Sequence, residues 1–90
     1  MSVLQNIAQL INENRLEEAL LLLNNSIKQC GNNDQLYFER GKLHWKMGNK
    51  PFAITDYEHA VSINPNSPAK IALENARDII SFFNPDIYNP

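Results

Sequence analysis

The sequence has little that could form a disulfide and no apolar run long enough to cross a bilayer. Its 90 residues include a single cysteine, which cannot form an internal disulfide, so we expect a cytoplasmic protein in a reducing compartment. No stretch approaches the roughly 20 consecutive apolar residues of a membrane-spanning helix. The first residues do not read as a signal peptide, because they lack a basic leader and Gln and Asn interrupt their apolar positions.

A strong charge of one sign and the alternation typical of β-strands are also missing. The formal net charge of −2 gives no general attraction to nucleic acid or to anionic lipid. No segment keeps the period of two residues that marks a strand, so we expect no sheet. The apolar and charged fractions, 43% and 20%, are ordinary for a globular protein. These features predict one small all-α domain.

Signals for helix ends divide the chain into five segments. Ser2 with Gln5, and Asn14 with Glu17, have the spacing of capping boxes. Glycine tolerates the left-handed conformation that often ends a helix, and proline is favourable in a first helical turn. Glycines 31 and 48 and prolines 51 and 68 therefore mark further ends, and Ser67 is expected to be the N-cap before Pro68. We expect helices at about 3–12, 15–30, 34–47, 51–63 and 68–83. The short connections require antiparallel neighbours.

The chain aligns with itself at an offset of 34 residues. Small residues recur, since Ala19 aligns with Ala53 and Ser26 with Ala60, while the large Leu23 aligns with Tyr57. Small residues at this spacing let two helices approach closely, and a large neighbour fills the space beside them. The offset indicates a helical repeat.

Residues 34–67 resemble a tetratricopeptide repeat. Seven residues match the motif of that family at its spacing: Tyr37, Gly41, Gly48, Ala53, Tyr57, Ala60 and Pro65. The unit departs at Arg40, where Leu is commoner, and at His44 and Lys50, where aromatic residues are usual. Residues 1–33 resemble the motif more loosely. They keep Leu16, Ala19, Leu23 and Ser26 but have Ile7 for a small residue, Asn14 for Gly and Gly31 for Pro.

The resemblance implies antiparallel helical hairpins stacked as a short right-handed α-solenoid, with a concave groove used for protein–protein contact. We expect one domain at 1–83, made of repeats at about 1–33 and 34–67 and a capping helix at about 68–83, followed by a tail at 84–90. Repeat arrays usually need about three units for stability. This chain has two and a cap, so the last helix must supply the remaining burial or the protein must self-associate.

The third helix carries the candidate binding residues. Phe38, Lys42 and Trp45 are spaced i, i+4, i+7 and share a face, which lines the groove in the resembling family. The predicted site for a protein or peptide partner consists of Gln35, Phe38, Glu39, Lys42, Trp45 and Lys46. Two alternatives remain: Phe38 and Trp45 could pack against the last helix, or a dimer could bury the same face.

The last helix is more apolar than a solvating cap needs to be. Its surplus must be covered by the tail, by a second copy or by a partner. The residues that could support self-association, and with it a homo-oligomer, are Ile79, Phe82, Phe83, Ile87 and Tyr88.

Other reactive residues have simpler interpretations. His44 is expected to be a partly buried structural residue, His59 a solvated one and Cys30 an ordinary thiol, and no cysteine pair supports a zinc site. Phosphate-loop and nucleophile motifs are missing, so we predict no catalytic residue, metal, cofactor or small-molecule substrate.

The basic residues around the third helix do not predict nucleic-acid binding. Arg40, Lys42, Lys46 and Lys50 are distributed around the helix, whereas a phosphate track needs them on one face. Some members of the resembling family clamp a peptide carboxylate with basic and Asn residues from three units. Lys42 alone cannot make that clamp.

Overall fold

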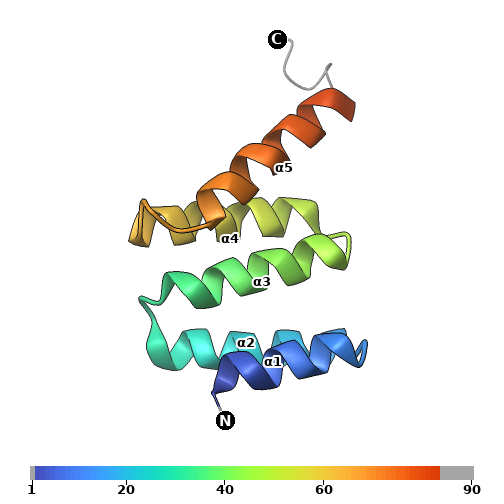
Figure 1. Ribbon diagram of the computed structural model, residues 1–90, viewed down its shortest axis with the longest axis vertical. Helices are drawn as coiled ribbons and strands as arrows, with labels where there is room; N and C mark the ends of the chain where they lie inside the picture. Colours follow the sequence, from blue (N-terminus) through green and yellow to red (C-terminus); the bar gives the residue numbers. More distant parts are fainter. Residues whose placement is uncertain (1, 84–90) are drawn as a thin grey trace.

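Five helices make up the part of the chain that the computed structural model describes, which is the backbone of residues 2–83 and the side chains of residues 2–79. They are α1 (Val3–Asn12), α2 (Leu16–Cys30), α3 (Asp34–Lys46), α4 (Lys50–Ile63) and α5 (Ala69–Phe83). Each begins and ends at or next to a predicted residue, and residues 2–83 contain no strand. The helices stack in chain order, with α5 at the end opposite the N-terminus (Figure 1). The all-α, repeat-like prediction is confirmed.

One of the two predicted capping boxes is present. The Ser2 hydroxyl accepts from the Gln5 amide at 3.2 Å, and the Gln5 side chain accepts from the Ser2 amide at 3.1 Å. The second prediction was wrong, because Arg15 precedes α2 and makes no side-chain cap bond. Asn14 has φ +60° instead. It closes the tight turn in which the Arg15 amide donates to the Leu10 carbonyl, and Asn is among the few residues that tolerate this conformation.

Side-chain caps also fix the starts of α3 and α5. The Asn33 side chain accepts from the amides of Gln35 and Leu36. The buried Ser67 hydroxyl accepts from the Ala69 amide at 3.1 Å, so Ser67 caps α5 as predicted. Each bond satisfies a donor that has no partner within its helix.

Two buried clusters hold the stack together, and α3 belongs to both. One cluster joins α1, α2 and α3 around Ile7, Ala19, Leu23, Leu36 and Leu43. The other joins α3, α4 and α5 around Tyr37, Ala53, Tyr57, Ala60, Ala69, Leu73 and Ala76. Because each cluster draws on more than one helical hairpin, neither hairpin completes its core alone.

The helices between residues 2 and 83 include none with the length and apolar character needed to cross a membrane.

Candidate protein-binding groove

Three hollows lie beside α3, and we call them together the α3 groove. The first, of about 330 Å3, lies between the start of α3 and the α4–α5 connection. The second, of about 180 Å3, lies between α3 and α5. The third, of about 220 Å3, lies between α1 and α3. The first, third and fifth helices thus contribute residues to hollows that share α3.

All six predicted site residues line the α3 groove, but they are divided among its hollows. The first hollow is lined by Gln35, Phe38 and Glu39, and the third by Glu39, Lys42 and Lys46. Of the six, only Trp45 lines the second hollow, where it faces residues of α5. The residues that share a helix face in the sequence therefore do not form one continuous strip.

Phe38 and Trp45 serve the core and the groove together. Both are half-buried and pack against the cluster formed by α3, α4 and α5. The Phe38 ring lies 6.1 Å from the Tyr57 ring, centroid to centroid. Packing against the last helix, one alternative raised by the sequence, is thus found for Trp45, which faces α5 residues across the second hollow. Phe38 contacts Tyr57 of α4 and borders the first hollow.

A lysine lies over each of these two aromatic rings. The Lys42 ammonium is 4.7 Å from the Phe38 centroid and 3.2 Å from the Glu39 carboxylate. The Lys50 ammonium, from the start of α4, is 5.2 Å from the Trp45 centroid. A cation over a ring face is attracted by the ring quadrupole. The groove therefore presents aromatic surface with positive charge at its rim.

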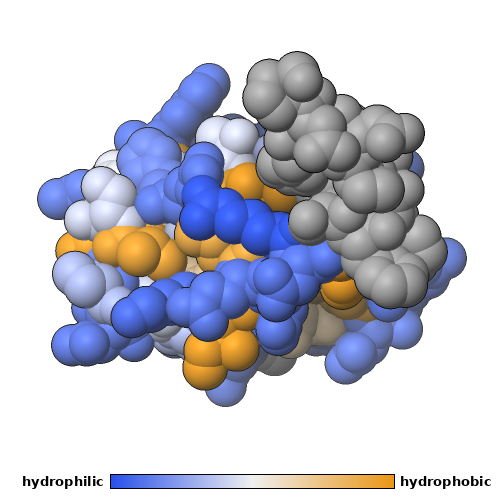
Figure 2. All heavy atoms as spheres, turned by 90° about the horizontal axis from the view of Figure 1, so that it is seen from above, coloured by the Kyte–Doolittle hydropathy of each residue, from blue (hydrophilic) through white to orange (hydrophobic). Residues whose placement is uncertain are grey.

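The α5 residues predicted for self-association are only partly described. Ile79 is 41% exposed and lines the second hollow opposite Trp45. The side chains of Phe82 and Phe83, together with Ile87 and Tyr88, lie outside the described residues. Ile71, which the sequence analysis did not select, is 65% exposed. Figure 2 looks onto the end of the stack that carries α5 and shows hydrophobic patches separated by hydrophilic residues.

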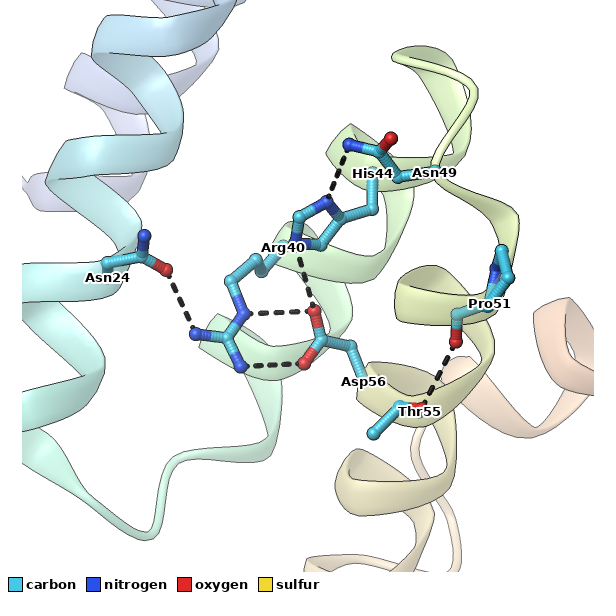
Figure 3. Close-up of polar contacts among 7 residues, drawn as sticks. All are labelled: Asn24, Arg40, His44, Asn49, Pro51, Thr55 and Asp56. Atoms are coloured by element: carbon cyan, nitrogen blue, oxygen red, sulfur yellow. Dashed lines mark hydrogen bonds and ion pairs between the residues drawn. The ribbon is translucent and has the colours of Figure 1, made fainter.

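A polar cluster between α2, α3 and α4 was missed by sequence reasoning (Figure 3). The Arg40 guanidinium donates to both carboxylate oxygens of Asp56, and to the side-chain oxygen of Asn24 at 2.9 Å. Asp56 is only 4% exposed. The one available signal was that Arg40 stands where Leu is commoner in the resembling family, since a charged residue at a packing position needs a buried partner.

His44 lies at the edge of this cluster, partly buried as predicted. Its Nδ1 is 3.4 Å from the Asn49 amide nitrogen, and its Nε2 is 3.9 Å from an Asp56 oxygen. Burial lowers the pKa of His44; the Asp56 charge opposes this shift, and the Arg40 charge adds to it. The neutral imidazole is therefore favoured at this position.

The other singled-out residues lie at the surface. His59 is exposed as predicted, but its ring also stacks on Tyr37, with centroids 4.0 Å apart, a contact that the sequence did not indicate. Cys30 is exposed. Among the described residues, no three His, Cys, Asp or Glu side chains converge in a way that could hold a metal ion.

Comparison with known proteins points to one family. The model of the family described as "Tetratricopeptide repeat" matches residues 34–67. Tetratricopeptide repeat protein 16 of Mus musculus is 37% identical over 54 residues, which are 60% of this chain but only 7% of that protein. The solution NMR structure of a Bacteroides fragilis protein matches with a TM-score of 0.87 and 34% identity, covering 99% of this chain and 91% of the other.

Proposed function

Because the chain belongs to the tetratricopeptide repeat family, whose repeats generally mediate contacts between proteins, we propose that it is a non-catalytic interaction module. Its α3 groove binds a segment of another protein. The residues that carry this binding are the six on α3 that line the three hollows, and Trp45 and Phe38 are its apolar anchors.

The observation that carries the proposal is the half-burial of Phe38 and Trp45 at the rims of the hollows. The core holds one side of each ring, so little side-chain entropy is lost when a partner covers the other side. Aromatic residues anchored in this way contribute much of the binding energy in many interfaces. Rigid, partly exposed rings beside lysines suit a peptide that carries both apolar and polar groups.

The dimensions of the hollows also favour a peptide. Pockets for drug-sized ligands usually measure about 300–1,000 Å3 and enclose most of the ligand. Two of the hollows, of about 180 and 220 Å3, are smaller than this range, and the first, of about 330 Å3, is at its lower limit, so each suits one or two side chains of an extended segment. A segment that reaches several hollows would gain specificity from their separation.

The test compares partners captured by the full chain and by its variants. Affinity purification with cross-linking is carried out with Trp45→Ala and Phe38→Ala, while circular dichroism verifies that each variant is folded. Phe52→Ala is the matched control, because Phe52 is an aromatic residue of α4, 64% exposed, that lines none of the three hollows. We expect both groove variants to lose partners that the control retains. Unchanged partners in a folded Trp45→Ala variant would reject the groove.

Self-association is a second proposal, supported by the exposure of Ile71 and Ile79 on α5. The exposed residues of the same helix include Lys70, Glu74, Arg77 and Asp78, whose charges oppose close packing of two copies. Sedimentation equilibrium decides the matter. A dimer that dissociates on the substitution Ile79→Asp would support it, and a monomer at high micromolar concentration would reject it.

A further inference from the structure

The charges along the α3 groove change sign from one end to the other. The first hollow, at the start of α3, is lined by Asp34 and Glu39 and by no basic residue. The third hollow, toward the end of α3, is lined by Lys42 and Lys46, and its one acidic lining residue, Glu39, is paired with Lys42. Lys50 adds a further positive charge above Trp45. This positive end stands out in a chain whose net charge is −2.

Two of the three lysines at this end are available to a ligand. Lys42 is already paired with Glu39. Lys46 and Lys50 are both exposed, and neither forms an ion pair with another described residue. Two like charges without carboxylate partners attract an acidic group on an approaching molecule.

The apolar hollow at the same end suits a single side chain. It is lined by Trp45 and Tyr57 on one side and by Ala72, Ala76 and Ile79 on the other. Its volume of about 180 Å3 is below the range usual for drug-sized ligands. Asn75 supplies the polar group of the lining, and its amide can donate to and accept from a peptide backbone.

Resting on the proposed function, we propose that the partner segment is an acidic–apolar peptide bound in one orientation. A Leu, Ile, Met or Phe side chain fills the hollow between Trp45 and Ile79, and a neighbouring Asp or Glu lies against Lys46 and Lys50. The segment then continues toward the Asp34 end, where an acidic residue is disfavoured. The change of charge along α3 determines which end of the bound segment lies near Lys46 and Lys50. The hollow determines which residue of the segment lies opposite Trp45.

The electrostatic part of this binding is modest and depends on salt. An exposed ion pair contributes about 0.2–1 kcal/mol, which is up to about fivefold in affinity for each lysine. Ions screen such pairs strongly above about 0.1 M salt. The acidic residue therefore acts mainly on orientation and selectivity, and the apolar anchor supplies most of the affinity.

The experiment selects randomised displayed peptides on the full chain. We expect enriched sequences to place an acidic residue close to a large apolar one. A selected peptide and its Asn/Gln analogue, which lacks the carboxylates, are then titrated by fluorescence anisotropy at low and high salt. The proteins compared are the wild type, Trp45→Ala, the double variant Lys46→Glu, Lys50→Glu and the control Lys28→Glu. Lys28 is an exposed lysine of α2 that lines none of the three hollows.

The double charge reversal should lower the affinity for the acidic peptide about tenfold at low salt and change the affinity for the neutral analogue far less. The Lys28→Glu control should bind like the wild type. Selected peptides that require Trp45 but carry no acidic residue, or that ignore the double reversal, overturn this inference and leave the proposed function standing. If none of the selected peptides depends on Trp45, the proposed function falls as well. A peptide made of residues 84–90 could also bind more tightly than the selected peptides and in a Trp45-dependent way. That result would assign the hollow to the chain's own C-terminal segment and overturn the inference that a separate partner fills it.

Discussion

Arg40 of α3 and Asp56 of α4 form a two-point ion pair, with Nε to Oδ2 at 2.9 Å and Nη2 to Oδ1 at 2.7 Å. The Asp56 side chain is 5% exposed and that of Arg40 is 23% exposed. The hydrogen bond from Arg40 to Asn24 extends the contact to α2. Removing one partner from such a buried pair costs more than the pair contributes, because the other charge stays desolvated. This asymmetry gives the first prediction.

Asp56→Ala should lower the free energy of unfolding by about 2–4 kcal/mol, because Arg40 would be left largely buried and unpaired. The double variant Arg40→Leu, Asp56→Leu should recover most of that loss, since apolar residues of similar size often replace a buried pair without cost. Urea denaturation of Asp56→Ala, of the single variants Arg40→Leu and Asp56→Leu, and of the double variant measures both effects. A double variant as unstable as the sum of the two single substitutions would contradict this account of the pair.

His44 should make stability depend on pH. Its folded-state pKa is lowered by burial, with Asp56 and Arg40 acting in opposite directions. The unfolded chain, with a His pKa near about 6.5, therefore binds the proton first as the pH falls. This contribution to stability is present above pH about 6.5 and decreases from there down to the folded-state pKa.

The variant His44→Gln should lack this contribution. We expect its free energy of unfolding to change less than that of the wild type between pH 7.5 and pH 5.5. The carboxylates are common to both proteins, so their contributions cancel when the two pH profiles are subtracted. NMR titration of the His44 imidazole should give a midpoint below that of an ordinary histidine. Parallel pH profiles for the two proteins would show that His44 is not the group responsible.

Gly41→Ala should destabilise the protein although alanine is the better helix former. A Cβ at position 41 would lie 2.6 Å from the Tyr57 ring and 3.3 Å from the Ala53 carbonyl oxygen. Tyr57 is buried, so its ring cannot move aside without disturbing the core. Overpacking costs about 1–3 kcal/mol, whereas the gain in helix propensity is about 1 kcal/mol.

The matched test of Gly41→Ala is the double variant Gly41→Ala, Tyr57→Leu. It should lose less stability than the two single substitutions combined, because the smaller Leu leaves room for the new methyl group. Thermal denaturation is sufficient to compare the four proteins. Additive losses would mean that the contact between positions 41 and 57 is not the cause.

Features fixed by neighbouring residues could be predicted from the sequence. The ends of the helices were accessible because caps such as Ser2 and Ser67 act over two or three residues. Asn14 was wrongly predicted to cap α2, because Asn suits both a helix cap and a left-handed turn. The geometry of the turn decides which of the two forms. The partnership of Arg40 with Asp56 joins residues on different helices. It depends on how α3 and α4 cross, which no local pattern specifies.

The same limit applies to the candidate site. Helical spacing predicted that Phe38, Lys42 and Trp45 share a face, and all three line the α3 groove. Their distribution over separate hollows depends on where α1 and α5 pack beside α3, and the spacing within one helix does not determine this. The Lys50–Trp45 contact was missed for the same reason, because its partners lie on successive helices.

Trp45, the only tryptophan in the sequence, offers a direct test of that contact. The Lys50 ammonium lies 5.2 Å from its ring centroid, well within the Debye length of about 10 Å at 0.1 M salt. It should therefore attract iodide, an anionic quencher of tryptophan fluorescence. Lys50→Glu should reduce the iodide quenching constant about four- to fifteenfold at low salt, since a unit charge at this distance in water changes the energy of a nearby ion by about 0.8 kcal/mol and the substitution changes the charge by two units.

Neutral acrylamide provides the control within the same experiment, because it responds to the exposure of Trp45 and not to charge. Its quenching constant should be nearly the same in the wild type and in Lys50→Glu, and Lys28→Glu should alter neither constant. The effect of Lys50→Glu on iodide should shrink as sodium chloride is raised, since the added ions screen the lysine. Equal iodide quenching in the wild type and Lys50→Glu at low salt would show that Lys50 does not lie over the ring in solution. The positive rim proposed for the second hollow would then rest on Lys46 alone.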